Sequence, residues 1–130
     1  MLSAASVVVR LNLRTGRASR VAGNDSSEFP RIHPRLNGQR HRWQLTASSW
    51  RPRSGVDHSF FHGLALTDQD SGRTERYDFG EHAIVEEHLW IAKPGSSDER
   101  DAWLLGTHFD SRAKVTKLSV FDARSLADGP

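Results

Sequence analysis

The 130-residue sequence predicts an all-β protein, and three observations lead to that prediction. Short segments alternate apolar and polar residues with a period of two, which is typical of half-buried strands. Turn signals rich in Gly, Asp, Ser and Pro separate these segments. No stretch keeps a helical apolar stripe for three turns, and residues 81–88, the one segment considered as a helix, have too few apolar residues to form a face.

The first predicted hairpin lies near the N-terminus. In residues 7–14, Val and Leu alternate with Arg and Asn, and Thr15-Gly16 follows as a turn signal. Residues 17–21 are then expected to return as a short strand. The remaining strands are predicted over residues 40–47, 60–66, 74–79, 87–92, 103–109 and 115–122, with turns at Asp70-Ser71-Gly72, Pro94-Gly95 and Ser111-Arg112.

Two of these hairpins resemble each other. Each has alternating apolar residues, a polar tip, a glycine and then an arginine, and the glycines Gly16 and Gly72 lie 56 positions apart. Residues 117–122, followed by Arg124, begin a third copy that the end of the sequence cuts short. A repeat of this length with about four short strands fits a propeller blade, so about two blades of a larger β-propeller are expected. An ordinary β-sandwich is the alternative. Because a blade buries its faces only against neighbours, the chain is expected to be an incomplete piece.

The composition limits the class of protein. Hydrophobic residues make up 36% and the mean hydropathy is -0.61, which is low for a compact globule and fits a core completed by neighbouring blades. The net charge is only +2, and the pI near 9.5 reflects the many arginines, so it is poor support for a nucleic-acid partner. The absence of Cys excludes disulfides, thiolate nucleophiles and Cys-based zinc sites. It is compatible with the cytoplasm, which is the expected location.

Targeting segments are not expected. The first nine residues are mildly apolar, but they lack a basic n-region and meet Arg10 after too few apolar residues for a signal peptide. No apolar run approaches the roughly 20 residues of a membrane span.

Seven histidines suggest a metal site, but their spacing does not support one. His58 and His62 are four residues apart, which on a strand separates them by roughly 13 Å. The carboxylates and imidazoles of residues 81–88 lack the HExxH order, and a strand sends Glu86 and Glu87 to opposite faces. The sequence also contains no G-x-S-x-G elbow and no phosphate-binding glycine loop. Surface positions or satisfied polar contacts are therefore expected for His33, His41, His58, His62, His82, His88 and His108.

Residues 31–53 contain six arginines, two tryptophans and no acidic residue. Cations with interleaved aromatic rings are one way to bind a phosphate backbone with base stacking. Such a stretch is more often solvated loop and strand edge, balanced by acids elsewhere, so no nucleic-acid partner is expected. The residues are Arg31, Arg35, Arg40, Arg42, Arg51 and Arg53, with Trp43 and Trp50.

Residues 28–32, Glu-Phe-Pro-Arg-Ile, form the most distinctive segment. The residue before a proline is held out of the helical region, so these residues alone predict an extended loop that enters a strand. Together with residues 33–35 and 38–43, the segment resembles the Glu-Phe-Pro-Arg-Ile region of the carotenoid cleavage oxygenases, a family that includes apocarotenoid, epoxycarotenoid and stilbene-cleaving dioxygenases. The resemblance continues in the family's order over residues 71–73, 77–80, 87–95, 101–105, 118–124 and 126–130.

The resemblance implies a seven-bladed β-propeller, of which residues 1–130 would form an incomplete domain of about two blades. It implies a non-haem iron(II), Fe(II), held by four histidines at the propeller axis. The iron would activate O2 for oxidative cleavage of a conjugated C=C bond in an apolar small molecule such as a carotenoid, apocarotenoid or stilbene. None of the seven histidines matches a ligand position of the family, so this segment alone is expected to bind no iron and to be inactive. Any peripheral membrane contact is expected through parts outside the segment.

The resemblance assigns a supporting role to Glu28 and Glu87. They match glutamates that accept hydrogen bonds from the ligand histidines, fixing the tautomer and orientation of each imidazole. His88 stands where the family commonly has Pro, which leaves Glu86 as a rival to Glu87. The alternative for both carboxylates is that they are ordinary exposed charges. The alternative function is a non-catalytic β-propeller binding module that holds a partner with loops such as residues 31–53.

Overall fold

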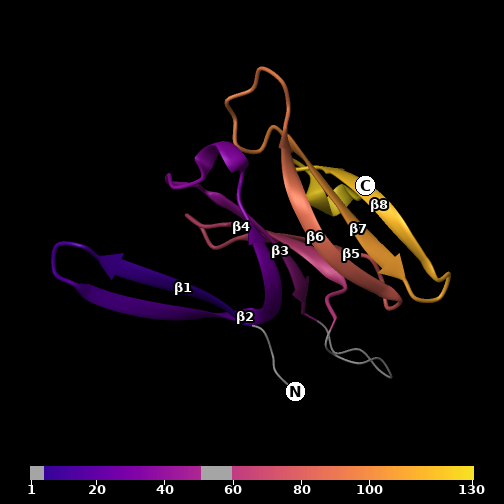
Figure 1. Ribbon diagram of the computed structural model, residues 1–130, viewed down its shortest axis with the longest axis horizontal. Coiled ribbons are helices and arrows are strands. Elements are labelled where there is room, and N and C mark those ends of the chain that lie inside the picture. Colours follow the sequence, from indigo (N-terminus) through magenta and orange to yellow (C-terminus); the bar gives the residue numbers. More distant parts are fainter. Residues whose placement is uncertain (1–4, 51–59) are drawn as a thin grey trace.

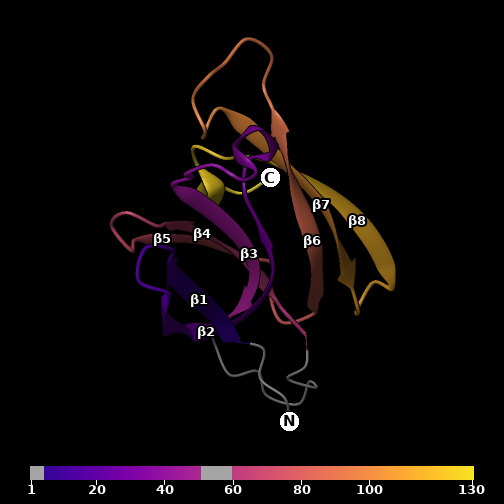
Figure 2. The ribbon, with the colours of Figure 1, turned by 60° about the vertical axis from the view of Figure 1, so that its left-hand side comes forward.

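The structure, a computed structural model, describes residues 5–50 and 60–130, and this part of the chain forms two antiparallel sheets (Figures 1 and 2). The strand order is β1-β2-β3-β4-β5 in the first sheet and β6-β7-β8 in the second. The all-β prediction is confirmed. The strands are β1 (Ala5–Asn12), β2 (Arg17–Arg31), β3 (Trp43–Ser49), β4 (Gly63–Asp68), β5 (Thr74–Asp78), β6 (Ala83–Ala92), β7 (Ala102–Asp110) and β8 (Val115–Asp122).

In the part of the chain that the structure describes, the helical elements are two three-residue 3-10 turns, η1 (Pro34–Leu36) and η2 (Leu126–Asp128). The described residues contain no helix with the length and apolar character needed to cross a membrane.

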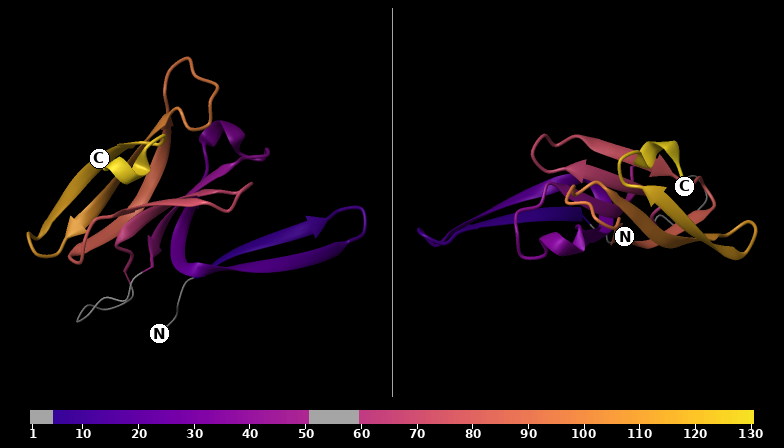
Figure 3. Two further views of the ribbon diagram at one scale, coloured as in Figure 1. Left: turned by 180° about the vertical axis from the view of Figure 1, so that it is seen from behind. Right: turned by 90° about the horizontal axis from the view of Figure 1, so that it is seen from above.

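The two hairpins of the sequence repeat are present, and both turn on a glycine. Gly16, between β1 and β2, has a φ of 66°, and Gly72, between β4 and β5, has a φ of 74°. Positive φ is readily adopted by glycine because it has no Cβ, so the repeated glycine has a conformational reason. The β1–β2 hairpin extends away from the rest of the chain (Figures 1 and 3).

The core lies between the two sheets. Leu45 and Leu66 pair across β3 and β4, and Trp90, Leu104 and Phe121 form a row across β6, β7 and β8. These five side chains are at most 5% exposed and belong to one apolar cluster. Burial of a large apolar side chain contributes about 1.5–3 kcal/mol. This layer therefore provides the main attraction between the sheets.

Aromatic rings close one side of this layer. The ring of Tyr77 lies 5.0 Å from the ring of Phe121, and the ring of Phe79 lies 5.7 Å from it, both in edge-to-face arrangements. Such pairs are favoured by the ring quadrupoles, in addition to the apolar area they bury. The loop that follows β5 is thereby held against β8 of the other sheet.

The outer face of the second sheet is apolar and exposed. Leu89 and Val120 flank Leu105 across the sheet, Trp103 lies beside them, and Leu118 on β8 is 68% exposed. The whole chain exposes 8538 Å², compared with about 6,900 Å² for a compact 14.6 kDa protein. A large exposed apolar face of this kind is typical of a surface that another element covers. The low hydrophobic content predicted such a shared core.

Several predicted boundaries were wrong, and a shift of pairing register accounts for two of them. The return strand expected over residues 17–21 continues to Arg31, and the segment expected as a loop at residues 28–32 lies largely inside it. The strand expected over residues 87–92 begins at Ala83, and no helix forms at 81–88. Both strands contain a shift of pairing register, which breaks the alternation on which the prediction depended. The strand expected over residues 40–47 begins at Trp43, after a bend.

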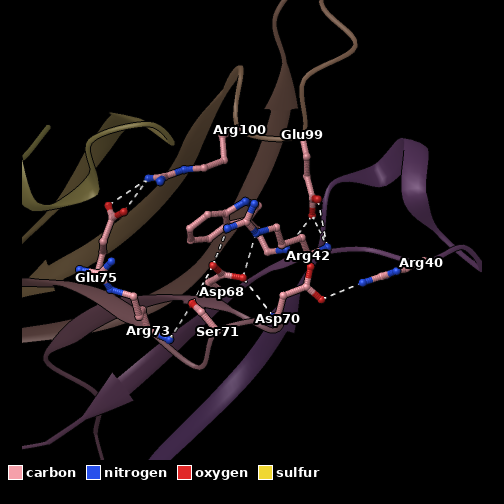
Figure 4. A network of polar contacts seen from close by, with 10 residues as sticks. Arg40, Arg42, Asp68, Asp70, Ser71, Arg73, Glu75, Glu99 and Arg100 are labelled. Carbon is pink, nitrogen blue, oxygen red and sulfur yellow. Dashed lines mark hydrogen bonds and ion pairs between the residues drawn. The ribbon is translucent and has the colours of Figure 1, made fainter.

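A network of charges joins the start of β3 to the connection between β6 and β7 (Figure 4). The Glu99 carboxylate accepts hydrogen bonds from the backbone N–H of Trp43 at 2.8 Å and of Arg42 at 3.0 Å. The next residue, Arg100, donates to the Glu75 carboxylate on β5 and to the Ala123 carbonyl. Two adjacent residues of one connection thus hold both the entry to β3 and the outer strand β5.

Trp43 lies between two guanidinium groups in this network. The guanidinium of Arg100 is 4.2 Å from the centre of the Trp43 ring, and that of Arg42 is 5.4 Å away. Arg42 also makes a two-pronged contact with the Asp68 carboxylate, at 3.0 and 2.7 Å, which holds the pKa of Asp68 well below its usual range. A bidentate contact fixes geometry as well as charge, so the Asp68 carboxylate holds the Arg42 guanidinium in place beside the Trp43 ring.

Replacing Glu99 tests whether this network joins the sheets. Glu99→Ala is expected to lower the free energy of unfolding by about 1–2 kcal/mol, because two backbone N–H groups lose their acceptor. Urea denaturation measures the change. Glu81→Ala is the matched control: Glu81 is exposed and makes no hydrogen bond or ion pair with a described residue, so its loss should change stability by at most about 0.5 kcal/mol. An equal effect of the two variants would contradict the role of Glu99.

Acid is expected to weaken the contact between the sheets through His88. Burial lowers the pKa of His88, whose Nδ1 lies 3.0 Å from the Glu86 carbonyl and whose Nε2 has no partner among the described residues. The unfolded chain binds this proton near pH 6.5 and the folded chain only at lower pH. The stability is therefore fully present above about pH 6.5 and is lost as the pH falls through the lowered pKa.

The measurement is the free energy of unfolding at a series of pH values between about 7.5 and 4.5. His88→Gln should flatten the loss of stability across this window, whereas the exposed His82→Gln should leave the loss as in the parent. Asp110 does not contribute here, because the Ala113 amide and Lys117 hold its pKa at about 2. An unchanged slope in His88→Gln would sink the assignment.

Candidate functional site

The described residues do not assemble a metal site. Residues 5–50 and 60–130 contain no group of three or more His, Asp or Glu side chains placed to hold an ion. The segment's own donors therefore do not fit an iron(II) centre, and any iron would need histidines from outside this part of the chain. His58 lies outside the described residues, so its expected separation from His62 is not tested.

The predicted polar contacts of the buried histidines are met at one nitrogen only, because the Nε2 atoms of His33, His62 and His88 are buried without a hydrogen-bond partner among the described residues. Four histidines each make one polar contact within the fold. Each uses Nδ1: His33 accepts from the Arg35 N–H at 3.3 Å, and His62 lies 3.3 Å from Asp78 Oδ1. The Nδ1 atoms of His88 and His108 contact the Glu86 carbonyl and the Ser119 hydroxyl, at 3.0 and 3.2 Å. These rings are parts of the packed fold rather than of a shared centre.

The two predicted carboxylates lie on strands that contact each other across the sheets. The last described pair of β1 with β2 is Ala5 with Ser26, so beyond that point no described strand pairs with this side of β2, and β6 is an edge strand among the described strands of its sheet. The elements β2 and β6 are in contact. Glu28 lies on β2 and Glu87 on β6, and both fall where the pairing register shifts.

The shift on β2 is a β-bulge. Glu28 pairs with Ala47 and Arg31 pairs with Leu45, so three steps along β2 correspond to two along β3. Phe29 inside the bulge has a φ of 53°, which is uncommon for a bulky side chain. Pro30, which follows it, has no N–H to give to a ladder. The extended backbone predicted before Pro30 was therefore wrong at Phe29, because the bulge turns the chain there.

The shift on β6 is a second β-bulge, and it separates two neighbouring carboxylates. Val85 pairs with His108 and His88 pairs with Gly106, which again gives three steps against two. The Glu86 carboxylate accepts a hydrogen bond from the Thr107 hydroxyl on β7, within its own sheet. The Glu87 carboxylate instead accepts from Arg31 on β2 of the other sheet. The two rivals thus contact different sheets.

Arg31 contacts β6 with both its side chain and its backbone. Its Nε and Nη2 both lie against Oε1 of Glu87, and its carbonyl accepts a hydrogen bond from the Trp90 indole N–H at 3.2 Å. Sequence reasoning missed this residue as part of the site. Two features of the sequence could have indicated it. Arg31 lies three residues after Glu28, and it opens residues 31–53, which contain no acid, so its charge needs a carboxylate from elsewhere in the chain.

Glu28 is exposed and makes no hydrogen bond or ion pair with another described residue. It lies on the wall of a pocket of about 340 Å³ that Val8, Phe29 and Pro30 also line. A second pocket, of about 600 Å³, is lined by Arg31 and Trp90 among others. The structure does not join Glu28 directly to Glu87. It places each at a bulge on one of two contacting strands.

The arginine-rich stretch is largely balanced by carboxylates, as expected. Arg31 pairs with Glu87, Arg40 with Asp70 at 3.0 Å, and Arg42 with Asp68 at 2.7 Å. Arg51 and Arg53 lie outside the described residues.

Comparisons with known proteins bear on the whole chain. A family model described as retinal pigment epithelial membrane protein matches residues 2–130. Over 99 residues the chain is 23% identical to apocarotenoid-15,15'-oxygenase of Synechocystis sp., covering 76% of this chain and 20% of that protein. Over 76 residues it is 29% identical to resveratrol cleavage oxygenase 1 of Aspergillus fumigatus, covering 58% of this chain and 15% of that protein.

Solved structures show the same fold. Cobalt-substituted Synechocystis ACO matches with a TM-score of 0.81 and 19% identity, over 91% of this chain and 24% of that chain. An ACO/RPE65 chimera matches with a TM-score of 0.81 and 17% identity over the same shares. The chain spans about a fifth or less of the length of the curated relatives it matches. Since the family model covers nearly every residue, the chain belongs to the retinal pigment epithelial membrane protein family, the carotenoid cleavage oxygenases.

Proposed function

We propose that this chain is part of an iron(II)-dependent oxygenase that uses O2 to cleave a conjugated C=C bond in a carotenoid, apocarotenoid or stilbene. The named relatives, an apocarotenoid oxygenase and a resveratrol cleavage oxygenase, support this class of apolar substrate. The chain's contribution to the centre is two carboxylates, Glu28 and Glu87. When bound, the iron would supply the activation of O2.

One observation carries the assignment of these residues. Glu28 and Glu87 both lie at β-bulges on two strands that contact each other, β2 and β6. Bulges re-aim side chains and are over-represented beside active sites. A regular ladder would keep each glutamate on one face of its sheet, whereas a bulge lets the strand point it along the sheet edge. A bulge at each of the two glutamates, on strands that contact each other, favours a role in a site over ordinary exposed charges.

The carboxylates retain the acceptor atoms that this role needs. Glu28 has no polar partner among the described residues, and Arg31 contacts only Oε1 of Glu87, leaving Oε2 able to accept. A carboxylate that accepts the N–H of a ligand imidazole fixes which nitrogen faces the metal and raises its basicity. Glu86 also keeps one oxygen without a hydrogen bond from a described residue, but its carboxylate is held within its own sheet by the Thr107 hydroxyl, whereas that of Glu87 contacts β2.

The test replaces single carboxylates in a chimera that carries residues 5–130 in the matching segment of the Synechocystis apocarotenoid oxygenase. Glu28→Gln and Glu87→Gln should each weaken Co(II) or Fe(II) binding about 10–100-fold, since amides orient imidazoles poorly. Glu86→Gln, on the same bulge, is the matched control and should leave affinity unchanged. Equal losses in Glu86→Gln and Glu87→Gln would count against the assignment.

The isolated chain gives a second test of the same proposal. It is expected to bind no stoichiometric iron after anaerobic loading and desalting, because the described residues place no three His, Asp or Glu side chains around one ion. Metal analysis of the desalted protein is the measurement. One tightly held iron per chain, with cleavage of an apocarotenoid, would overturn the view that the ligands come from elsewhere.

A further inference from the structure

We propose that Arg31 is a positioning residue that orients the Glu87 carboxylate. This inference rests on the proposed function, in which Glu87 supports a ligand histidine. It adds a residue that sequence reasoning did not assign, and it makes the orientation of a carboxylate on one sheet depend on the other sheet.

The contact between Arg31 and Glu87 uses one carboxylate oxygen only. Nε and Nη2 of Arg31 both lie against Oε1, and no other described residue contacts the carboxylate. Both donors of the rigid guanidinium plane hold Oε1 of Glu87 against β2. Oε2 makes no hydrogen bond with a described residue, so its lone pairs are available to an N–H donor on the side away from Arg31.

The backbone of Arg31 anchors the side chain that makes this contact. The Trp90 indole donates to the Arg31 carbonyl at 3.2 Å, and Trp90 is only 5% exposed. Trp90 lies three residues after Glu87 on β6. Arg31 therefore contacts β6 at two residues, at Glu87 inside the bulge and at Trp90 beyond it. The guanidinium therefore starts from a fixed backbone position rather than from a mobile loop.

The exposure of the pair indicates that orientation, rather than stability, is its main contribution. The Arg31 and Glu87 side chains are 48% and 37% exposed. Ion pairs with this exposure are screened by water and contribute little to folding. A role that is merely structural would predict a loss of stability on removing the guanidinium, whereas a positioning role predicts a change at Glu87 with the fold retained.

The same guanidinium links the two predicted glutamates through the chain. Glu28 and Arg31 flank the β2 bulge, with Phe29 and Pro30 between them. Because these residues share one bulge, a change that straightens β2 would move Glu28 and release Glu87 together. The two carboxylates then form one unit across the sheets instead of two independent supports.

The first experiment uses the isolated chain and nuclear magnetic resonance. In Arg31→Met, the Glu87 side-chain carboxyl 13C signal should move to the position of a solvated glutamate. The Trp90 indole N–H should keep its shift and slow exchange, because its acceptor is a backbone carbonyl that Met also supplies. Arg31→Lys should restore the Glu87 signal only in part, since an ammonium lacks the planar pair of donors. Arg40→Met, which removes the exposed pair with Asp70, is the control and should change neither signal.

Two outcomes of this experiment would overturn the proposal. An unchanged Glu87 signal in Arg31→Met would show that the guanidinium does not orient the carboxylate. Loss of the Trp90 signal together with the Glu87 signal, in both Arg31→Met and Arg31→Lys, would show a structural role only.

The second experiment uses the chimera and measures Co(II) affinity. Arg31→Met should weaken binding about 10-fold, at the low end of the loss expected for Glu87→Gln. The double variant should lose no more than Glu87→Gln alone, because Arg31 acts through Glu87. Additive losses would overturn the positioning role. Glu87→Gln could leave Co(II) affinity unchanged while Arg31→Met still shifts the Glu87 carboxyl 13C signal. In that case the proposed function of Glu87 fails and its orientation by Arg31 stands.

Discussion

Trp90, Leu104 and Phe121 of the second sheet belong to the same buried cluster as Leu45 and Leu66 of the first, and this contact fixes how the sheets meet. Without it, β6 would have no reason to run beside β2, since no ladder joins the two sheets. Once the apolar layer forms, the inner edges approach closely enough for side chains to reach across. The charged network at Glu99 then holds one end of the same junction, where β3 begins. Apolar packing supplies the attraction, and the polar contacts select one arrangement.

The two β-bulges interrupt the regular alternation of side chains, and so they can re-aim the glutamates that lie on them. Each adds one residue to the inner strand, and each occurs at a predicted glutamate. The cost is visible at Phe29, whose positive φ is unfavourable for a bulky side chain. Strain of this kind persists only where the surrounding structure imposes it, and here the ladders with β3 on one side and the Trp90 contact on the other do so.

Local patterns predicted the parts of the fold that depend on neighbouring residues. The alternation of Val and Leu with Arg in β1, and the turn glycines Gly16 and Gly72, need no distant partner to be recognised. The bulges could not be predicted in this way, because a register shift is a relation between two strands. At β6 the extra residue disrupts the alternation, which is why Ala83 and Val85 were not included in that strand.

The same distinction, between features set by neighbouring residues and features set by distant contacts, applies to the candidate site. Glu28 and Glu87 were singled out by their resemblance to a family pattern, and their bulges came only from the structure. The sequence groups Arg31 with the other arginines of residues 31–53, a stretch that contains no acidic residue. Its partner lies 56 residues away. Pairings over such separations are set by the packing of the sheets, so no local pattern contains them.

The outermost strands β1 and β8 have a further consequence for how the chain behaves at high concentration. Each has one side without a partner in the described sheets, and Val9, Leu11 and Leu118 project from them with most of their area exposed. Such edges are templates for the addition of another strand. Arg10 places positive charge on β1, so two copies repel each other at that edge, whereas the charge of Lys117 on β8 is paired with Asp110. Added salt screens that repulsion, and the solubility of the isolated chain therefore depends on ionic strength.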